Sequence, residues 1–83
     1  MTRLNKIREK LIDAFQPDVI NVIDETQDHF GHGGYDANGS HFAIEISAQV
    51  FKDKKLIETH RLIYTALADM MQNEIHALKI KIL

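Results

Sequence analysis

The sequence has 83 residues, enough for one domain with a single hydrophobic core. Ten Lys and Arg against twelve Asp and Glu give a formal net charge of −2, so the chain as a whole has no strong attraction for nucleic acid or an anionic membrane. The absence of cysteine excludes a disulfide scaffold and fits a reducing compartment. No run has the length of a membrane span and no charged-then-apolar leader opens the chain, so we expect a cytoplasmic protein with no membrane partner.

The N-terminal part of the chain predicts a helix followed by a strand. Thr2 is a suitable helix N-cap. After it, apolar residues recur at helical spacing: Leu4, Ile7, Leu11 and Phe15. We expect this helix to end at Pro17, because the residue before a proline is pushed out of the α-helical region. Residues 19–25 then have the two-residue period of a half-buried strand.

Residues 26–40 predict a long loop between this strand and the next. All four glycines lie in this range, together with several Asp, Asn and Ser residues. Structureless connections of this length are usually functional or disordered. Residues 42–48 alternate again, and we expect them to form a second strand that pairs with the first.

The last part of the chain predicts a long helix and a third strand. After a charged turn at residues 52–55, the helix is expected to run to about Asn73, with a break near Asp69. Its core-facing residues would be Leu56, Ile63, Leu67 and Met70. Residues 78–82 alternate as a strand does. The order α-β-β-α-β makes residues 1–83 a single α+β domain, with helices packed on one face of a three-stranded mixed sheet.

Short motifs along the chain resemble those of the BolA family. The most specific are His60-Arg61-Leu62-Ile63-Tyr64 and Ile75-His76-Ala77-Leu78, taken together. The others follow the family's order: Asp24-Glu25-Thr26, His29, His41-Phe42, Phe51 and Leu67. Asp53 and Thr59 depart from the pattern, because the family usually has glycine and arginine there. The resemblance covers nearly the whole chain and implies a fold similar to the type II KH domain, in agreement with the α-β-β-α-β order.

The resemblance also implies partnership with a monothiol glutaredoxin. In such complexes a [2Fe–2S] cluster is shared: the glutaredoxin cysteine and glutathione supply two ligands, and the BolA protein supplies the other two. Carried onto this chain, those two ligands fall on His76 and His29. Two imidazoles in place of thiolates on one iron are a known variant that raises the reduction potential. The implied function is iron–sulfur cluster assembly or transfer, or iron sensing.

Two further histidines are weaker alternatives to His29. His32 and His41 follow it in the sequence, and with nearby aspartates they form a set of nitrogen and oxygen donors that could bind zinc, nickel or copper. The loop histidines could equally be solvated, and His76 could be a partly buried residue between helix and strand. For His41 we expect a capping or packing role at the start of the second strand.

The second function that the resemblance implies is DNA-binding transcriptional regulation. Basic residues near the start of the long helix could meet phosphates: Lys52, Lys54, Lys55 and Arg61. A solvated helix start explains the same cluster. A GxxG sequence occurs at residues 31–34, but between two strands rather than the two helices that a KH domain requires, so we do not assign it to phosphate binding. We expect Tyr64 to face the core rather than to stack on bases.

The sequence does not favour an enzyme. It contains no paired nucleophile and base, no phosphate-binding loop followed by lysine, and no two carboxylates at a telling spacing. We therefore expect a binding protein that is a monomer or a weak homodimer when free. The cluster could be absent from the isolated protein.

Overall fold

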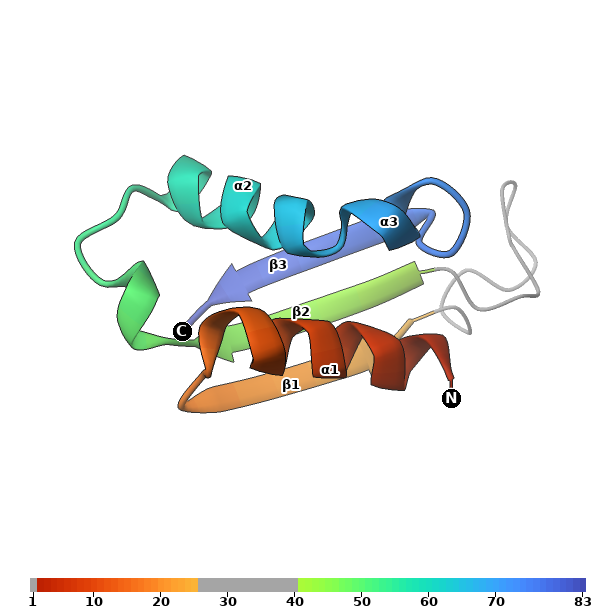
Figure 1. Cartoon of the computed structure of the whole chain (residues 1–83), viewed down its shortest axis with the longest axis horizontal. Coiled ribbons are helices and arrows are strands. Elements are labelled where there is room, and N and C mark those ends of the chain that lie inside the picture. The colour runs from red at the N-terminus through yellow and green to blue at the C-terminus, as the bar shows by residue number, and fades with distance from the viewer. Residues whose placement is uncertain (1, 26–40) are drawn as a thin grey trace.

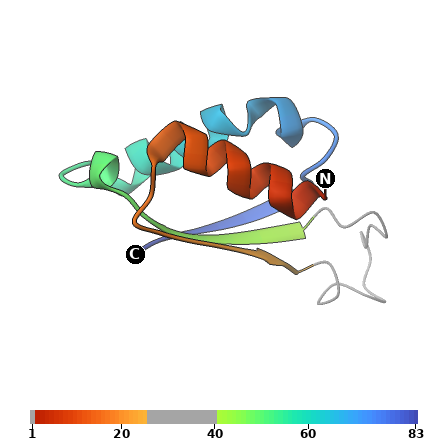
Figure 2. The same ribbon diagram turned by 60° about the horizontal axis from the view of Figure 1, so that its bottom comes forward.

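The computed structural model describes residues 2–25 and 41–83, which form two layers (Figure 1). Three strands form one sheet, and α1, α2 and α3 all cover the same face of it (Figure 2). In chain order the elements are α1 (Arg3–Phe15), β1 (Val19–Asp24), β2 (His41–Ser47), the short 3₁₀ helix η2 (Gln49–Phe51), α2 (Leu56–Ala66), α3 (Ala68–Met71) and β3 (Ala77–Ile82). The predicted α+β class and the mixed sheet are confirmed. The predicted loop at residues 26–40 lies outside the described residues.

Helix α1 begins and ends where the sequence predicts. Thr2 has an extended backbone, and its Oγ1 accepts a hydrogen bond from the Asn5 N–H at 3.1 Å. At the other end Gln16 takes the left-handed conformation (φ 47°), and its N–H donates to the Ile12 carbonyl at 2.9 Å. Pro17 follows and prevents the helix from continuing. The helix therefore has both of its ends satisfied while its apolar stripe packs into the core.

The sheet has the order β1-β2-β3, with β2 in the centre. Strands β1 and β2 are antiparallel, with Val19 opposite Ser47 and Asp24 opposite Phe42. Strands β2 and β3 are parallel, with His41 opposite Ala77 and Ile46 opposite Ile82. Because successive side chains on a strand point to opposite faces, one set from β2 is buried under the helices. That set is Phe42, Ile44 and Ile46.

The long helix predicted after residue 55 is two helices. α2 ends at Ala66, and Leu67 leaves helical geometry (φ −102°, ψ 10°) before α3 begins. The break thus comes two residues before Asp69, and it leaves both Leu67 and Met70 in the core, as predicted. Among the described residues, no helix is long and apolar enough to cross a bilayer.

Two of the predicted core positions on α2 are wrong. Leu56 is 60% exposed, because it lies in the first turn, where Cα–Cβ bonds tilt toward the N-terminus and off the end of the helix. Thr59, one turn later, is buried instead, and its hydroxyl donates to the Leu56 carbonyl at 2.7 Å. Tyr64 is 41% exposed, because it follows the buried Ile63 and is turned by about 100° from it around the helix.

Candidate functional site

The structure brings two histidines together at one end of the sheet, where β2 and β3 begin. His41 is the first residue of β2, and His76 immediately precedes Ala77, the first residue of β3. Since His41 and Ala77 are partners in the parallel ladder, His76 lies beside His41. The centroids of the two imidazole rings are 5.5 Å apart, and the ring planes are inclined by 47°. We call this part of the molecule the histidine end.

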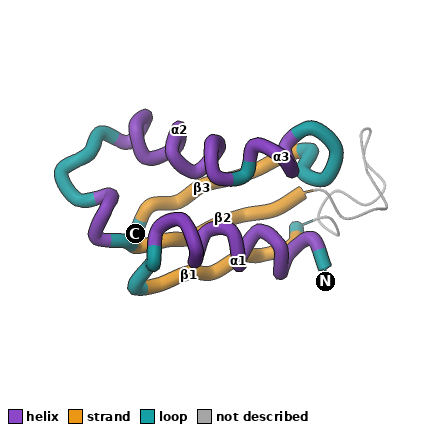
Figure 3. The backbone as a smooth tube through the Cα atoms, viewed as in Figure 1, coloured by secondary structure: helices purple, strands orange, loops and turns teal. Residues whose placement is uncertain are grey.

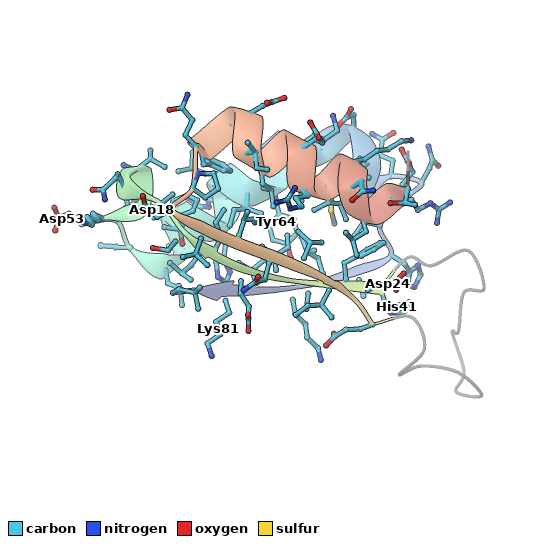
Figure 4. The ribbon with its side chains drawn as sticks, turned by 90° about the horizontal axis from the view of Figure 1, so that it is seen from below. Asp18, Asp24, His41, Asp53, Tyr64 and Lys81 are labelled. Carbon is cyan, nitrogen blue, oxygen red and sulfur yellow. The ribbon has the colours of Figure 1, made fainter. Side chains whose placement is uncertain are left out.

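The two imidazoles differ in their access to solvent. His41 is only 7% exposed, whereas His76 is exposed. The backbone of His41 is held by the residue that follows β1, because the Glu25 N–H donates to the His41 carbonyl at 2.8 Å. The Glu25 carboxylate in turn lies 3.3 Å from Lys79 Nζ on β3, which ties the two edge strands together across this end. Figure 4 shows His41 here beside Asp24 of β1. One donor is thus recessed and fixed, and the other is presented at the surface.

A pair of imidazoles suits a borderline metal, including iron in a cluster with histidine ligands. Within the described residues, no group of three or more His, Cys, Asp or Glu is arranged to hold a metal ion. Two nitrogens are half of the ligands that a tetrahedral metal needs. A metal at the histidine end would therefore take its other ligands from elsewhere.

The structure places two of the histidines named in the sequence analysis, and their role as ligands stays a prediction. His76 immediately precedes β3, and its side chain is exposed. His41 packs at the start of β2 as expected, and its position beside His76 was not foreseen, because local patterns do not show that β2 and β3 are parallel neighbours. His29 and His32 belong to residues 26–40, outside the described residues, so their assignment stays a prediction.

The predicted basic residues lie at the opposite end of β2. Lys52, Lys54 and Lys55 are exposed on the turn between η2 and α2, and Arg61 is exposed further along α2. This turn is the loop beside the end of β2 in Figure 3. Figure 4 labels Asp53, which lies within the turn, at the far end of the molecule from His41. Asp53 has a positive φ of 65°, the conformation that glycine adopts most easily.

Comparison with known proteins identifies relatives of this chain. The family model described as BolA-like protein matches residues 11–83. The DNA-binding transcriptional regulator BolA of Escherichia coli (strain K12) is 36% identical over 73 residues, which are 88% of this chain and 67% of that protein. The solved structure of BolA1 from Arabidopsis thaliana superposes with a TM-score of 0.87 and 29% identity, covering 99% of this chain and 90% of that one.

A larger relative matches this chain over a small part of its own length. The SufE-like protein 1, chloroplastic/mitochondrial, of Arabidopsis thaliana is 36% identical over 80 residues, which are 90% of this chain but 22% of that protein. The chain therefore corresponds to about a fifth of this relative and to about two thirds of the E. coli regulator.

Proposed function

Because the chain belongs to the BolA family, we propose that it binds a monothiol glutaredoxin and shares a [2Fe–2S] cluster with it and with glutathione. The role would be cluster assembly or transfer, or iron sensing. The observation that carries this proposal is the pairing of His41 and His76, whose rings lie 5.5 Å apart at the histidine end.

The chemistry of the pair supports this proposal. His76 is exposed, so a partner protein can reach its imidazole without unfolding any described element. His41 is recessed and its backbone is held by the residue that follows β1, so it would hold a fixed position while the partner docks. A cluster ligated by two imidazoles on one iron is a one-electron centre with a raised reduction potential. The protein would contribute two neutral nitrogen donors, and the partner the thiolates.

The position of the second ligand is open to direct test. The family resemblance implies His29, whereas the geometry of the described residues favours His41 because it already lies beside His76. We propose His76 as the first ligand and His41 as an alternative to His29 for the second.

Reconstitution with a monothiol glutaredoxin, iron, sulfide and glutathione tests the proposal. We expect a coloured heterodimer whose visible spectrum differs from that of the glutaredoxin homodimer, because imidazole removes sulfur-to-iron charge transfer at one iron. His76→Ala should abolish this spectrum. Comparing His41→Ala with His29→Ala then identifies the second ligand as the one whose loss is more damaging. His60→Ala, on α2, is the matched control and should leave the spectrum unchanged. Survival of the heterodimer spectrum in His76→Ala would remove the basis of the proposal.

We propose DNA-binding regulation as a second function, supported by two observations. An E. coli relative has the name DNA-binding transcriptional regulator BolA, and the side chains of Lys52, Lys54, Lys55 and Arg61 are exposed in this chain. Each phosphate contact contributes a slope of about −0.9 to the dependence of log affinity on log salt. Binding to duplex DNA should therefore weaken steeply with salt. Lys54→Ala, Lys55→Ala and Arg61→Ala should each remove about one phosphate contact and so reduce the magnitude of the slope by about 1. Binding that is indifferent to salt and to these changes would exclude this function.

A further inference from the structure

Three large aliphatic side chains are exposed around the turn between η2 and α2. Leu56 is 60% exposed, Ile57 is 58% exposed and Val50 is 43% exposed. Single exposed aliphatic residues are ordinary, but a local group of them ringed by polar residues is typical of an interaction surface. Because Leu56 and Ile57 open α2 and Val50 lies in η2, the three flank a single turn of the chain.

The turn is held firmly by its neighbours, so the exposure does not come from a loose segment. The Phe51 ring is buried, and its centroid lies 4.9 Å from that of Phe15 on α1. The Lys52 N–H donates to the Gln49 carbonyl at 3.1 Å, and Thr59 anchors the first turn of α2 in the core. The aliphatic side chains are therefore presented outward by a framework that is already packed, which lowers the entropy cost of binding.

The charge of the same turn is opposite to that of the whole chain. Three lysines (Lys52, Lys54 and Lys55) against one aspartate (Asp53) give it a charge of +2, while the chain carries −2. The N-terminus of α2 adds the positive end of a helix dipole, opposed by one exposed carboxylate in its first turn, Glu58. A partner that matches this surface must bring apolar side chains together with negative charge.

We propose that this surface, formed by Val50, Lys52, Lys54, Lys55, Leu56 and Ile57 and called here the lysine patch, docks an acidic amphipathic segment of a partner protein. Apolar side chains of that segment would cover Leu56, Ile57 and Val50, and its carboxylates would pair with the lysines. Duplex DNA would meet the lysines but leave the aliphatic side chains uncovered, and single-stranded nucleic acid would need aromatic platforms. A membrane surface would favour a longer apolar face with aromatic residues.

This proposal goes beyond the proposed cluster-sharing function because the lysine patch is separate from the histidine end, and it competes with the DNA function, which uses the same lysines. His41 begins β2, and the lysine patch begins three residues after β2 ends at Ser47. Six rises of a strand, from His41 to Ser47, place about 20 Å between them. Figure 1 shows η2 and the start of α2 at the end of the sheet opposite the start of β2. The protein could thus hold one partner at each end.

Selection from a displayed library of short random peptides tests the proposal without assuming a partner. The full chain is the only selection target, and the selected peptides are then measured on the double variant Leu56→Ser/Ile57→Ser. We expect the selected peptides to combine Asp or Glu with apolar residues at helical spacing and to lose about tenfold or more in affinity for the double variant, as expected for loss of central apolar anchors. Peptides without net negative charge, or peptides that bind the double variant equally well, would overturn the proposal.

Control variants distinguish loss of the lysine patch from misfolding, and further measurements distinguish a peptide from other binding partners. Val19→Ser/Ile23→Ser alters two exposed aliphatic residues on the open face of the sheet and should keep full peptide affinity. Lys54→Glu/Lys55→Glu keeps the aliphatic residues and should weaken the acidic peptides as strongly as the serine variant. Patch-dependent binding of phosphatidylserine vesicles or of duplex DNA in place of peptides, or a homodimer lost in the serine variant, would overturn the proposal. Loss of the glutaredoxin heterodimer in the serine variant would also overturn it, because the patch would then belong to that interface.

Discussion

The two ends of strand β2 present opposite chemistries on the same framework. At the histidine end, two imidazole side chains meet because two parallel strands begin side by side. At the lysine patch, aliphatic and cationic side chains gather because they are neighbours in sequence, between Val50 and Ile57. The first surface depends on tertiary pairing, and the second depends on one well-anchored turn. Variants should therefore affect the two ends separately unless they reach the core between them.

The largest expected effect comes from that shared core. Ile44 is buried in the middle of β2, and Ile44→Ala should reduce the free energy of unfolding by about 2–5 kcal/mol. Both ends should lose function together, because both are supported by β2. Ile23→Ala, on the half-exposed face of β1, should cost less than about 1 kcal/mol. Urea denaturation measures the free energy of unfolding of both variants. Equal losses would contradict a core that lies on only one face of the sheet.

A smaller effect is expected in the turn of the lysine patch. Asp53 has a φ of 65°, so Asp53→Gly should relieve backbone strain and raise the free energy of unfolding by about 0.5–1 kcal/mol. It also removes the carboxylate among the lysines, so acidic peptides should bind more tightly. Lys54→Gly is the control: its φ is not positive, and glycine there should lower stability by a similar amount. Stabilisation by both changes, or by neither, would contradict the left-handed turn.

The smallest effect concerns two ion pairs between α1 and the segment that precedes the histidine end. Lys10 Nζ lies 2.9 Å from Asp69 Oδ2, and Lys6 Nζ lies 3.0 Å from Glu74 Oε2, so α1 is tied to the segment before His76. The hydrogen bond from Lys10 lowers the pKa of Asp69 from its ordinary value of 3.8, against the opposing effect of desolvation. A lowered carboxyl pKa contributes stability that is present above the ordinary value and is lost as the pH falls through the lowered one.

The carboxyl NMR resonance of Asp69 measures this effect directly. We expect its titration midpoint to lie below 3.8 in the wild type and to move up toward 3.8 in Lys10→Ala. Because Asp69 is exposed, the change in overall stability should be small. A midpoint that does not respond to Lys10→Ala would show that the pair does not form in solution.

Local patterns in the sequence predicted the elements of this fold well. Thr2 and Pro17 mark the ends of α1, and the alternation in residues 19–25, 42–48 and 78–82 marks three strands. Leu56 and Tyr64 were placed wrongly because periodicity shows which residues share a stripe, but not where the sheet beneath that stripe ends or which side of the helix it covers.

Prediction of the candidate site depended on information of a different kind. The family resemblance pointed to His76, whereas the position of His41 beside it follows from the parallel pairing of β2 and β3. Strands that are neighbours in space but separated by two helices leave no local trace of their register. The exposed side chain of Leu56 was missed for a related reason, since its place in the apolar stripe of the helix predicted burial.

Pulsed EPR of the reduced heterodimer tests the central assignment most directly. With ¹⁵N-histidine incorporated into this chain only, the unpaired electron should show hyperfine coupling to imidazole nitrogen, because histidine ligates one iron of the cluster. We expect coupling to two nitrogens in the wild type and its loss in His76→Ala. Whichever of His41→Ala and His29→Ala removes one of the two couplings identifies the second ligand. A reduced heterodimer cluster with no coupling to ¹⁵N-histidine would contradict ligation at the histidine end.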